Sequence, residues 1–140
     1  MLTAPLQRAR LKVLIADDHT LVAEGIAKIL QDDFDVVATV DNGADLVRSA
    51  QRYSPDLALI DVSMPELTGV EAARKLTELV PGCKVICVTM HSNPEFVREA
   101  FRAGASGYVL KRSAGSELLE AIRQVLKGNA NARNAVNVRK

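Results

Sequence analysis

Five short runs of apolar residues alternate along the chain with longer segments in which apolar residues recur every three or four positions. The short runs are rich in Val, Ile and Leu and are bounded by Asp, Pro or Gly, as buried strands usually are. They cover Lys12–Ala16, Asp35–Val40, Leu57–Asp61, Lys84–Thr89 and Gly107–Leu110. We interpret these runs as the strands of a parallel sheet.

The segments between the runs each have one apolar face at helical spacing. The faces consist of Leu21, Val22, Ile26, Ile29 and Leu30; of Leu46, Val47 and Ala50; of Val70, Ala73, Leu76 and Val80; of Phe96, Ala100 and Phe101; and of Leu118, Leu119, Ile122, Val125 and Leu126. Pro94 suits a first helical turn, Gly104 and Gly128 suit left-handed helix ends, and Ser113 or Ser116 can cap the last helix. The alternation predicts an α/β fold of the (βα)₅ type, a doubly wound parallel five-stranded sheet with helices on both faces.

The pattern predicts one domain. The chain has 140 residues, of which 48% are hydrophobic and 25% are charged, a composition typical of a globular protein. The alternation occupies residues 11–128, and residues 1–10 precede it as an N-terminal extension. Residues 129–140 have no periodic apolar face and are interpreted as a linker or a disordered tail.

Net charge and cysteine content limit the expected partners and cellular location of the protein. A formal net charge of +1 gives no bulk reason to bind nucleic acid or a membrane. The sequence has no run long enough to span a membrane and no secretory signal pattern, so we expect a cytoplasmic location. Cys83 and Cys87 lie on one extended segment, where four residues span roughly 13 Å, which is too far for a disulfide. We expect both to be small core residues.

Polar residues stand at the carboxyl ends of the predicted strands. Asp17 and Asp18 follow the first strand, Asp61 ends the third, Thr89 ends the fourth, and Lys111 follows the fifth. With the flavodoxin-like strand order 2-1-3-4-5, these side chains converge at one edge of the sheet. Three carboxylates that close need a counter-charge, which a divalent cation and Lys111 would supply. Such a site suits the binding and transfer of a phosphoryl group.

These residues and their neighbours resemble the receiver domain of a bacterial two-component response regulator, over about residues 12–128. The resemblance rests on Asp17-Asp18, Asp61-Val62-Ser63-Met64-Pro65 with Gly69, Val88-Thr89, and Gly107-Tyr108-Val109-Leu110-Lys111. Within the family, the chain is most similar to the NarL/FixJ group, which carries a LuxR-type helix-turn-helix after the receiver. That similarity lies in Ala16-Asp17-Asp18-His19, Val88-Thr89-Met90-His91 and Gly104-Ala105-Ser106-Gly107-Tyr108.

The resemblance implies that Asp61 attacks a phosphoryl donor and becomes an acyl phosphate. Asp18, Asp61 and the backbone carbonyl of Ser63 would bind Mg²⁺ or Mn²⁺, and Asp17 would hold a metal-bound water. Lys111 would offset charge on the transferred group. The chain would then be a signalling phosphoacceptor that catalyses its own phosphorylation and dephosphorylation, and not a metabolic enzyme.

A switch is also implied by the resemblance. The Thr89 hydroxyl would bond the attached phosphoryl group, and Tyr108 would turn inward as Thr89 moves. This movement would change the surface formed by the fourth helix, fifth strand and fifth helix. The implied partners are a sensor histidine kinase, a second copy of the chain on phosphorylation, and DNA through a C-terminal helix-turn-helix that these residues do not include. No membrane partner is implied.

Three further positions are expected to modulate the lifetime of the acyl phosphate. Ser63 and His91 stand two positions after Asp61 and Thr89, where attacking water would enter. Met90 follows Thr89 directly, and its large side chain would narrow access to the phosphoryl group. By contrast, His19 is interpreted as a loop residue near the site and not as a metal ligand, because Mg²⁺ prefers oxygen.

Alternative functions use the same pattern. A stand-alone receiver would act by protein contact alone. An aspartyl-phosphate phosphatase would carry a second Asp two residues after its nucleophile, where this chain has Ser63. A flavodoxin-like nucleotide binder would need a Gly-rich or Ser/Thr-rich phosphate loop after the first strand, but Asp17-Asp18-His19-Thr20-Leu21 is acidic.

Overall fold

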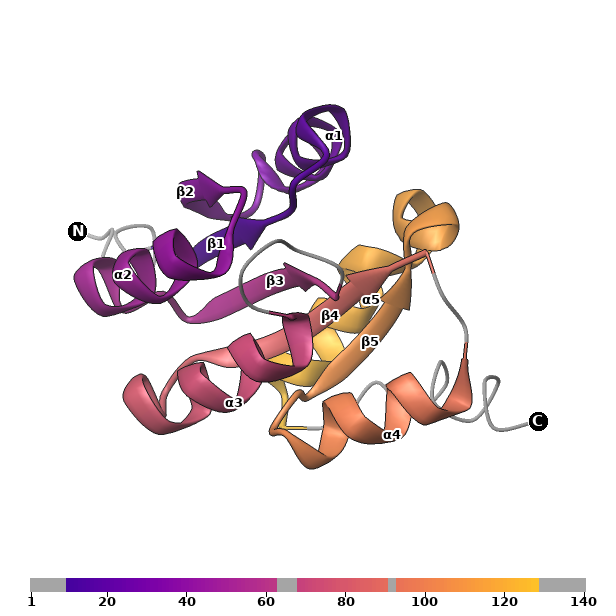
Figure 1. Ribbon diagram of the computed structural model, residues 1–140. Helices are drawn as coiled ribbons and strands as arrows, with labels where there is room; N and C mark the ends of the chain where they lie inside the picture. Colours follow the sequence, from indigo (N-terminus) through magenta and orange to yellow (C-terminus); the bar gives the residue numbers. More distant parts are fainter. Residues whose placement is uncertain (1–9, 63–67, 91–92, 129–140) are drawn as a thin grey trace.

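The computed structural model describes residues 10–62, 68–90 and 93–128 of the chain, and its strands form one parallel sheet (Figure 1). The strands are β1 (Lys12–Ala16), β2 (Asp35–Val40), β3 (Leu57–Asp61), β4 (Lys84–Thr89) and β5 (Gly107–Leu110). Their order is β2-β1-β3-β4-β5. The predicted strand bounds and the flavodoxin-like order are confirmed. The proposed N-terminal extension, apart from Arg10, and the tail lie outside the described residues and stay predictions.

Five α-helices cover the two faces of this sheet. They are α1 (Thr20–Leu30), α2 (Gly43–Tyr53), α3 (Gly69–Leu79), α4 (Pro94–Arg102) and α5 (Ala114–Leu126), with a 3₁₀ turn, η2 (Lys111–Ser113), before α5. Buried residues of α2, α3 and α4 pack on one face, and those of α1 and α5 pack on the other. Figure 1 shows α3 and α4 on the opposite side of the sheet from α5. In the described ranges, no helix combines the length and apolar character needed to cross a bilayer.

The sheet is apolar on both faces, as doubly wound parallel sheets are. Successive residues of β1 alternate between the two cores: Leu14 packs in the α2–α4 core, whereas Val13 and Ile15 pack in the α1–α5 core. All five residues of β3 are buried, whereas no residue of the edge strand β2 is fully buried. The best protected part of the sheet is therefore its centre, where β3 ends in Asp61.

Two residues assigned to apolar helix faces are instead exposed. Leu21 is 82% exposed, because the buried face of α1 is centred on Ala23, Ile26 and Leu30, on the other side of the helix. Phe96 is also exposed, because Val97 and Ala100 hold the centre of the α4 core face. The predicted burial of these two side chains is wrong.

Most predicted helix ends are confirmed. Pro94 begins α4, and Gly104 and Gly128 have φ angles of +115° and +91° after α4 and α5. Ser113 occupies the N-cap position of α5, but its side chain makes no capping hydrogen bond. The chain enters α5 from the η2 turn, so the Ala114 N–H is already bonded to the Lys111 carbonyl. The predicted serine cap is therefore wrong as a hydrogen bond.

Candidate functional site

The carboxyl ends of the central strands bring the predicted polar residues to one edge of the sheet. Asp17 and Asp18 follow β1, Asp61 ends β3, and Thr89 ends β4. Strands β1, β3 and β4 are direct neighbours, and Lys111 follows β5 beside β4. The Asp17 N–H donates to the Val40 carbonyl at 2.9 Å, which ties the loop after β1 to β2.

Lys111 supplies a buried positive charge between two buried carboxylates. Its Nζ lies 3.0 Å from Asp17 Oδ2 and 3.4 Å from Asp61 Oδ2. The Lys111 side chain is 6% exposed, and both carboxylates are more deeply buried. Charges in such a poorly solvated place interact more strongly than surface charges, so Lys111 offsets much of their repulsion.

His19 lies near the site, as expected, and its ring nitrogen contacts the carboxylates, which the sequence interpretation did not predict. Its Nδ1 lies 3.2 Å from Asp17 Oδ1, 3.1 Å from Asp18 Oδ1 and 3.9 Å from Asp61 Oδ2. The Lys111 ammonium lies 3.4 Å from the same ring atom. The available sequence signal was the position of His19 directly after the Asp pair, at the point where α1 begins.

The cluster fits a divalent cation. Asp17, Asp18, His19 and Asp61 each offer one ligand atom, and these atoms all lie within 4.8 Å of one another. Asp17 Oδ2 is buried and accepts no hydrogen bond from any residue the structure describes; its contact with Lys111 is an ion pair. A buried carboxylate oxygen that keeps a lone pair available beside this ion pair suits a hard cation such as Mg²⁺. These residues could therefore hold the predicted metal.

Thr89 and Tyr108 form a buried pair next to the acidic cluster. Both residues are fully buried. Burial raises the pKa of Tyr108 to about 12, with Cys87 acting in the same direction and a side-chain hydrogen bond to Thr89 opposing the shift. The Thr89 side chain is thus connected to an aromatic ring of the α2–α4 core.

Of the three residues expected to modulate the acyl phosphate lifetime, the structure describes Met90. Met90 follows β4 and is 68% exposed, so its side chain lies at the surface. Ser63 and His91 lie outside the described residues. The expected metal contact of the Ser63 carbonyl and the expected effects of all three residues on acyl phosphate lifetime stay predictions.

The comparisons with known proteins agree on one family. The family model described as the response regulator receiver domain matches residues 13–123. The transcriptional regulatory protein DegU of Brevibacillus brevis is 37% identical over 123 residues, covering 86% of this chain and 52% of that protein. The response regulator GacA of Pseudomonas aeruginosa is 42% identical over 120 residues, covering 84% of this chain and 56% of that protein. The chain thus spans about half the length of these curated relatives.

Solved structures agree with the sequence relatives. The receiver domain of the response regulator NarL from Mycobacterium tuberculosis has a TM-score of 0.81 and 31% identity, covering 87% of this chain and 100% of that one. A LuxR family two-component response regulator from Aurantimonas sp. SI85-9A1 has a TM-score of 0.84 and 30% identity, covering 94% and 99% respectively. The chain therefore belongs to the response regulator receiver domain family, and its relatives are LuxR-family response regulators of the NarL and DegU type.

Proposed function

We propose that this receiver domain accepts a phosphoryl group on Asp61 from a sensor histidine kinase, in a reaction that requires Mg²⁺ or Mn²⁺. The observation that carries the proposal is the buried arrangement of Asp61, Asp17 and Lys111, with the ammonium 3.4 Å from Asp61 Oδ2 and 3.0 Å from Asp17 Oδ2. A carboxylate at the end of a buried strand, beside a buried cation, suits nucleophilic attack on phosphorus.

The residues have distinct parts in this transfer. A carboxylate oxygen of Asp61 attacks phosphorus, the bond from phosphorus to the donor nitrogen breaks, and the electron pair leaves with the donor imidazole, which takes up a proton. Asp18, Asp61 and the Ser63 carbonyl would hold the metal ion, with Asp17 completing the acidic set. The ion would neutralise charge on the phosphoryl oxygens. Lys111 offsets charge on the same group from the β5 side.

The proposal includes a conformational switch. An acyl phosphate adds a charge of about −1.5 to −2 next to Thr89, whose hydroxyl can donate to a phosphoryl oxygen. Because Thr89 is already hydrogen bonded to Tyr108, such a change would alter the packing of Tyr108 against the α2–α4 core. The outcome would be a shift in population between two states of the surface formed by α4, β5 and α5.

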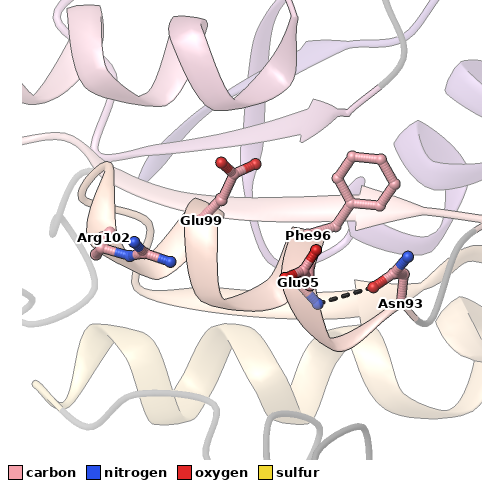
Figure 2. Close-up of a pocket in the computed structure, with 5 residues that line it drawn as sticks. All are labelled: Asn93, Glu95, Phe96, Glu99 and Arg102. Carbon is pink, nitrogen blue, oxygen red and sulfur yellow. Dashed lines mark hydrogen bonds between the residues drawn. The ribbon is translucent and has the colours of Figure 1, made fainter.

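That surface has features suited to a protein contact. Figure 2 shows a depression on α4 lined by Asn93, Glu95, Phe96, Glu99 and Arg102. The exposed Phe96 ring lies among charged side chains, and the Asn93 side chain accepts from the Glu95 N–H at 2.8 Å. An aromatic ring surrounded by charged side chains is typical of a protein–protein interface. We propose that a second copy of the chain binds there when Asp61 is phosphorylated.

We further propose that the output is transcription control through a C-terminal helix-turn-helix. Support comes from the curated relatives, which are about twice as long as the matched region and include a transcriptional regulatory protein. A similar structure, at 26% identity, is described as two RcsB dimers bound to two parallel DNAs. The proposal places the protein in the cytoplasm, where the buried free thiols of Cys83 and Cys87 would stay reduced.

The direct test is intact-mass analysis after incubation with acetyl phosphate, with and without Mg²⁺. Wild type should gain one phosphoryl group in a Mg²⁺-dependent manner, and Asp61→Asn should gain none. Asp32→Asn is the matched control, because Asp32 is an exposed acid just after α1. An adduct that persists in Asp61→Asn, or that forms equally without a divalent cation, would contradict the proposal.

A further inference from the structure

His19 occupies an unusual position for a loop histidine. Its Nδ1 lies between two carboxylates, 3.1 Å from Asp18 Oδ1 and 3.2 Å from Asp17 Oδ1. Although His19 is the N-cap residue of α1, its side chain makes no capping hydrogen bond. The ring is directed to the acidic cluster and takes no part in ending the helix.

We propose that His19 is a nitrogen ligand of the cation site and that it makes the site favour first-row transition-metal dications, such as Mn²⁺, over Mg²⁺. The inference rests on the proposed function in one respect, which is the placement of a cation among Asp17, Asp18 and Asp61. It departs from the interpretation of His19 as a bystander near an all-oxygen site.

The spacing of the ligand atoms supports this assignment. Atoms bound about 2.1 Å from one cation lie roughly 3.0–3.4 Å apart when they are neighbours in the coordination shell. His19 Nδ1 has this spacing to an oxygen of Asp17 and to an oxygen of Asp18, and Asp61 Oδ2 is 3.9 Å away. The ligand atoms of the four groups all lie within 4.8 Å of one another, so the groups would have to draw closer together to surround one ion.

The Asp17 carboxylate can take a further cation. Its buried Oδ2 forms an ion pair with Lys111 Nζ at 3.0 Å and accepts no hydrogen bond from the part of the chain that the structure describes. The other oxygen, Asp17 Oδ1, accepts the His19 backbone N–H at 2.8 Å, which fixes the carboxylate and the histidine relative to each other. The pair is thus held together before an ion enters.

The position of the ring allows ligation. A metal ligand needs a lone pair on Nδ1, so the neutral ring would carry its proton on Nε2. The His19 side chain is 60% exposed, and a proton on Nε2 can therefore be solvated. Lys111, at 3.4 Å from Nδ1, already provides positive charge to the carboxylates and can remain paired with Asp17 and Asp61.

The preference follows from the chemistry of the donor. Imidazole nitrogen binds first-row transition-metal ions well, whereas Mg²⁺ takes oxygen ligands and retains water. A site with three carboxylates and one imidazole would bind both classes of ion. Replacing the imidazole would remove the ligand that makes the site distinguish between the two classes of ion.

The test uses the full 140-residue chain and Mn²⁺ as the probe, at one fixed pH for all proteins. Free Mn²⁺ is measured by electron paramagnetic resonance during titration, and Mg²⁺ affinity is measured by displacement of Mn²⁺. The variants are His19→Phe, His19→Gln and Asp18→Asn. Pulsed resonance then detects nitrogen coupling to the bound ion. The chain has two histidines, so His91→Phe identifies which of them gives a nitrogen signal.

Because groups that merely support a metal ligand typically contribute 10–100-fold to affinity, we expect both His19 variants to bind Mn²⁺ at least about tenfold more weakly, with Mg²⁺ affinity little changed. The nitrogen coupling should disappear in His19→Phe and persist in His91→Phe. Bound Mn²⁺ without His19 coupling, or an unchanged ratio of Mn²⁺ to Mg²⁺ affinity, would overturn this inference alone. Absence of Mn²⁺ binding, or binding that survives Asp18→Asn, would overturn the proposed metal site as well.

Discussion

The Tyr108 and Thr89 side chains are hydrogen bonded to each other between neighbouring strands, and both residues are fully buried. Thr89 ends β4 at the edge that carries the acidic cluster, and Tyr108 belongs to the core beneath α2, α3 and α4. This bond is a direct physical link between the candidate site and the core that supports α4.

The energy of that link can be measured with a double-mutant cycle. Thr89→Val leaves the buried Tyr108 hydroxyl without this partner, and we expect a loss of about 1–3 kcal/mol in the free energy of unfolding. Combined with Tyr108→Phe, the loss should be smaller than the sum of the two single losses, because both partners of one bond are then removed. Urea unfolding of the four proteins gives the coupling, and additive effects would contradict a bond that matters to stability.

The switch role of Tyr108 makes a separate prediction. Tyr108→Ala should still take up phosphate from acetyl phosphate, because Asp61 and Lys111 are unchanged, but it should lose phosphorylation-dependent dimerisation. Light scattering before and after phosphorylation measures this response. Tyr108→Phe serves as the milder variant, since it keeps the ring and loses the hydroxyl. A dimerisation response unchanged in both variants would remove Tyr108 from the mechanism.

Position 104 requires glycine because of its backbone conformation and because a neighbouring side chain leaves no room for a Cβ. Its φ is +115°, and a Cβ built on it would clash with Thr77 Oγ1 on α3. We expect Gly104→Ala to lower the free energy of unfolding by about 2–4 kcal/mol, from backbone strain and overpacking.

Two other glycines provide controls for Gly104→Ala. Gly128 has a φ of +91°, and a Cβ there would meet no described residue within 4 Å, so Gly128→Ala tests backbone strain. Gly82→Ala has open space and should be close to neutral. Adding Thr77→Ala to Gly104→Ala should restore part of the loss. Equal losses at Gly104 and Gly128 in thermal unfolding would show that the contact with Thr77 is unimportant.

Because the carboxylates of the acidic cluster lie close together, we expect a divalent cation to stabilise the folded protein. Without divalent cations, Asp61→Asn should unfold at a higher temperature than wild type, because one of several like charges within a few ångströms is removed; the gain is on the order of 1–2 kcal/mol. Added Mg²⁺ should stabilise wild type by about 1.4 kcal/mol per tenfold excess over its dissociation constant, and Asp61→Asn much less. Thermal unfolding in EDTA and in a Mg²⁺ series measures both. Equal responses to Mg²⁺ would argue against Asp61 as a ligand.

Alkaline pH should destabilise the protein through its buried thiols. Burial, with a smaller contribution from Asp61, raises the pKa of Cys87 from 9.0 to about 12. Between these values the unfolded thiol is ionised and the folded thiol is protonated, so the free energy of unfolding falls as pH rises. Below the lower value this contribution to the pH dependence vanishes.

The Cys87 contribution is about 1.4 kcal/mol per pH unit. Cys87→Ala should therefore show a shallower decline in urea unfolding experiments above the unfolded thiol pKa. The pKa of Cys83 is also raised to about 12, chiefly by burial, so part of the decline should remain in the variant. Identical slopes for wild type and Cys87→Ala would contradict the assignment.

The strands were predictable because their signal is local. Each is a short run rich in Val, Ile and Leu and bounded by a residue such as Asp61 or Gly107, and the structure keeps the predicted bounds. The convergence of Asp17, Asp61 and Lys111 needed a strand order as well, which the alternating pattern and the receiver resemblance provided. Local pattern and topology together were sufficient for the fold and for this part of the cluster.

The features that escaped prediction depend on contacts across the fold. The contacts of His19 Nδ1 with the Asp17 and Asp18 carboxylates arise from the path of the loop after β1, which residue type alone does not predict. Leu21 and Phe96 were assigned to core faces because they are apolar, but the faces of α1 and α4 are set by neighbours that pack on the sheet. The bond between Thr89 and Tyr108 depends on the pairing of β4 with β5.

The position of each strand in the sheet also determines how easily it can move. β3, which ends in Asp61, is hydrogen bonded on both sides, whereas the four-residue β5 with Tyr108 is at the edge of the sheet that the described residues form and pairs with β4. Displacing β3 would break two ladders of hydrogen bonds, and displacing β5 would break one. The sheet is therefore stiff at the carboxylate that would receive a phosphoryl group and more compliant at the strand that would transmit the change.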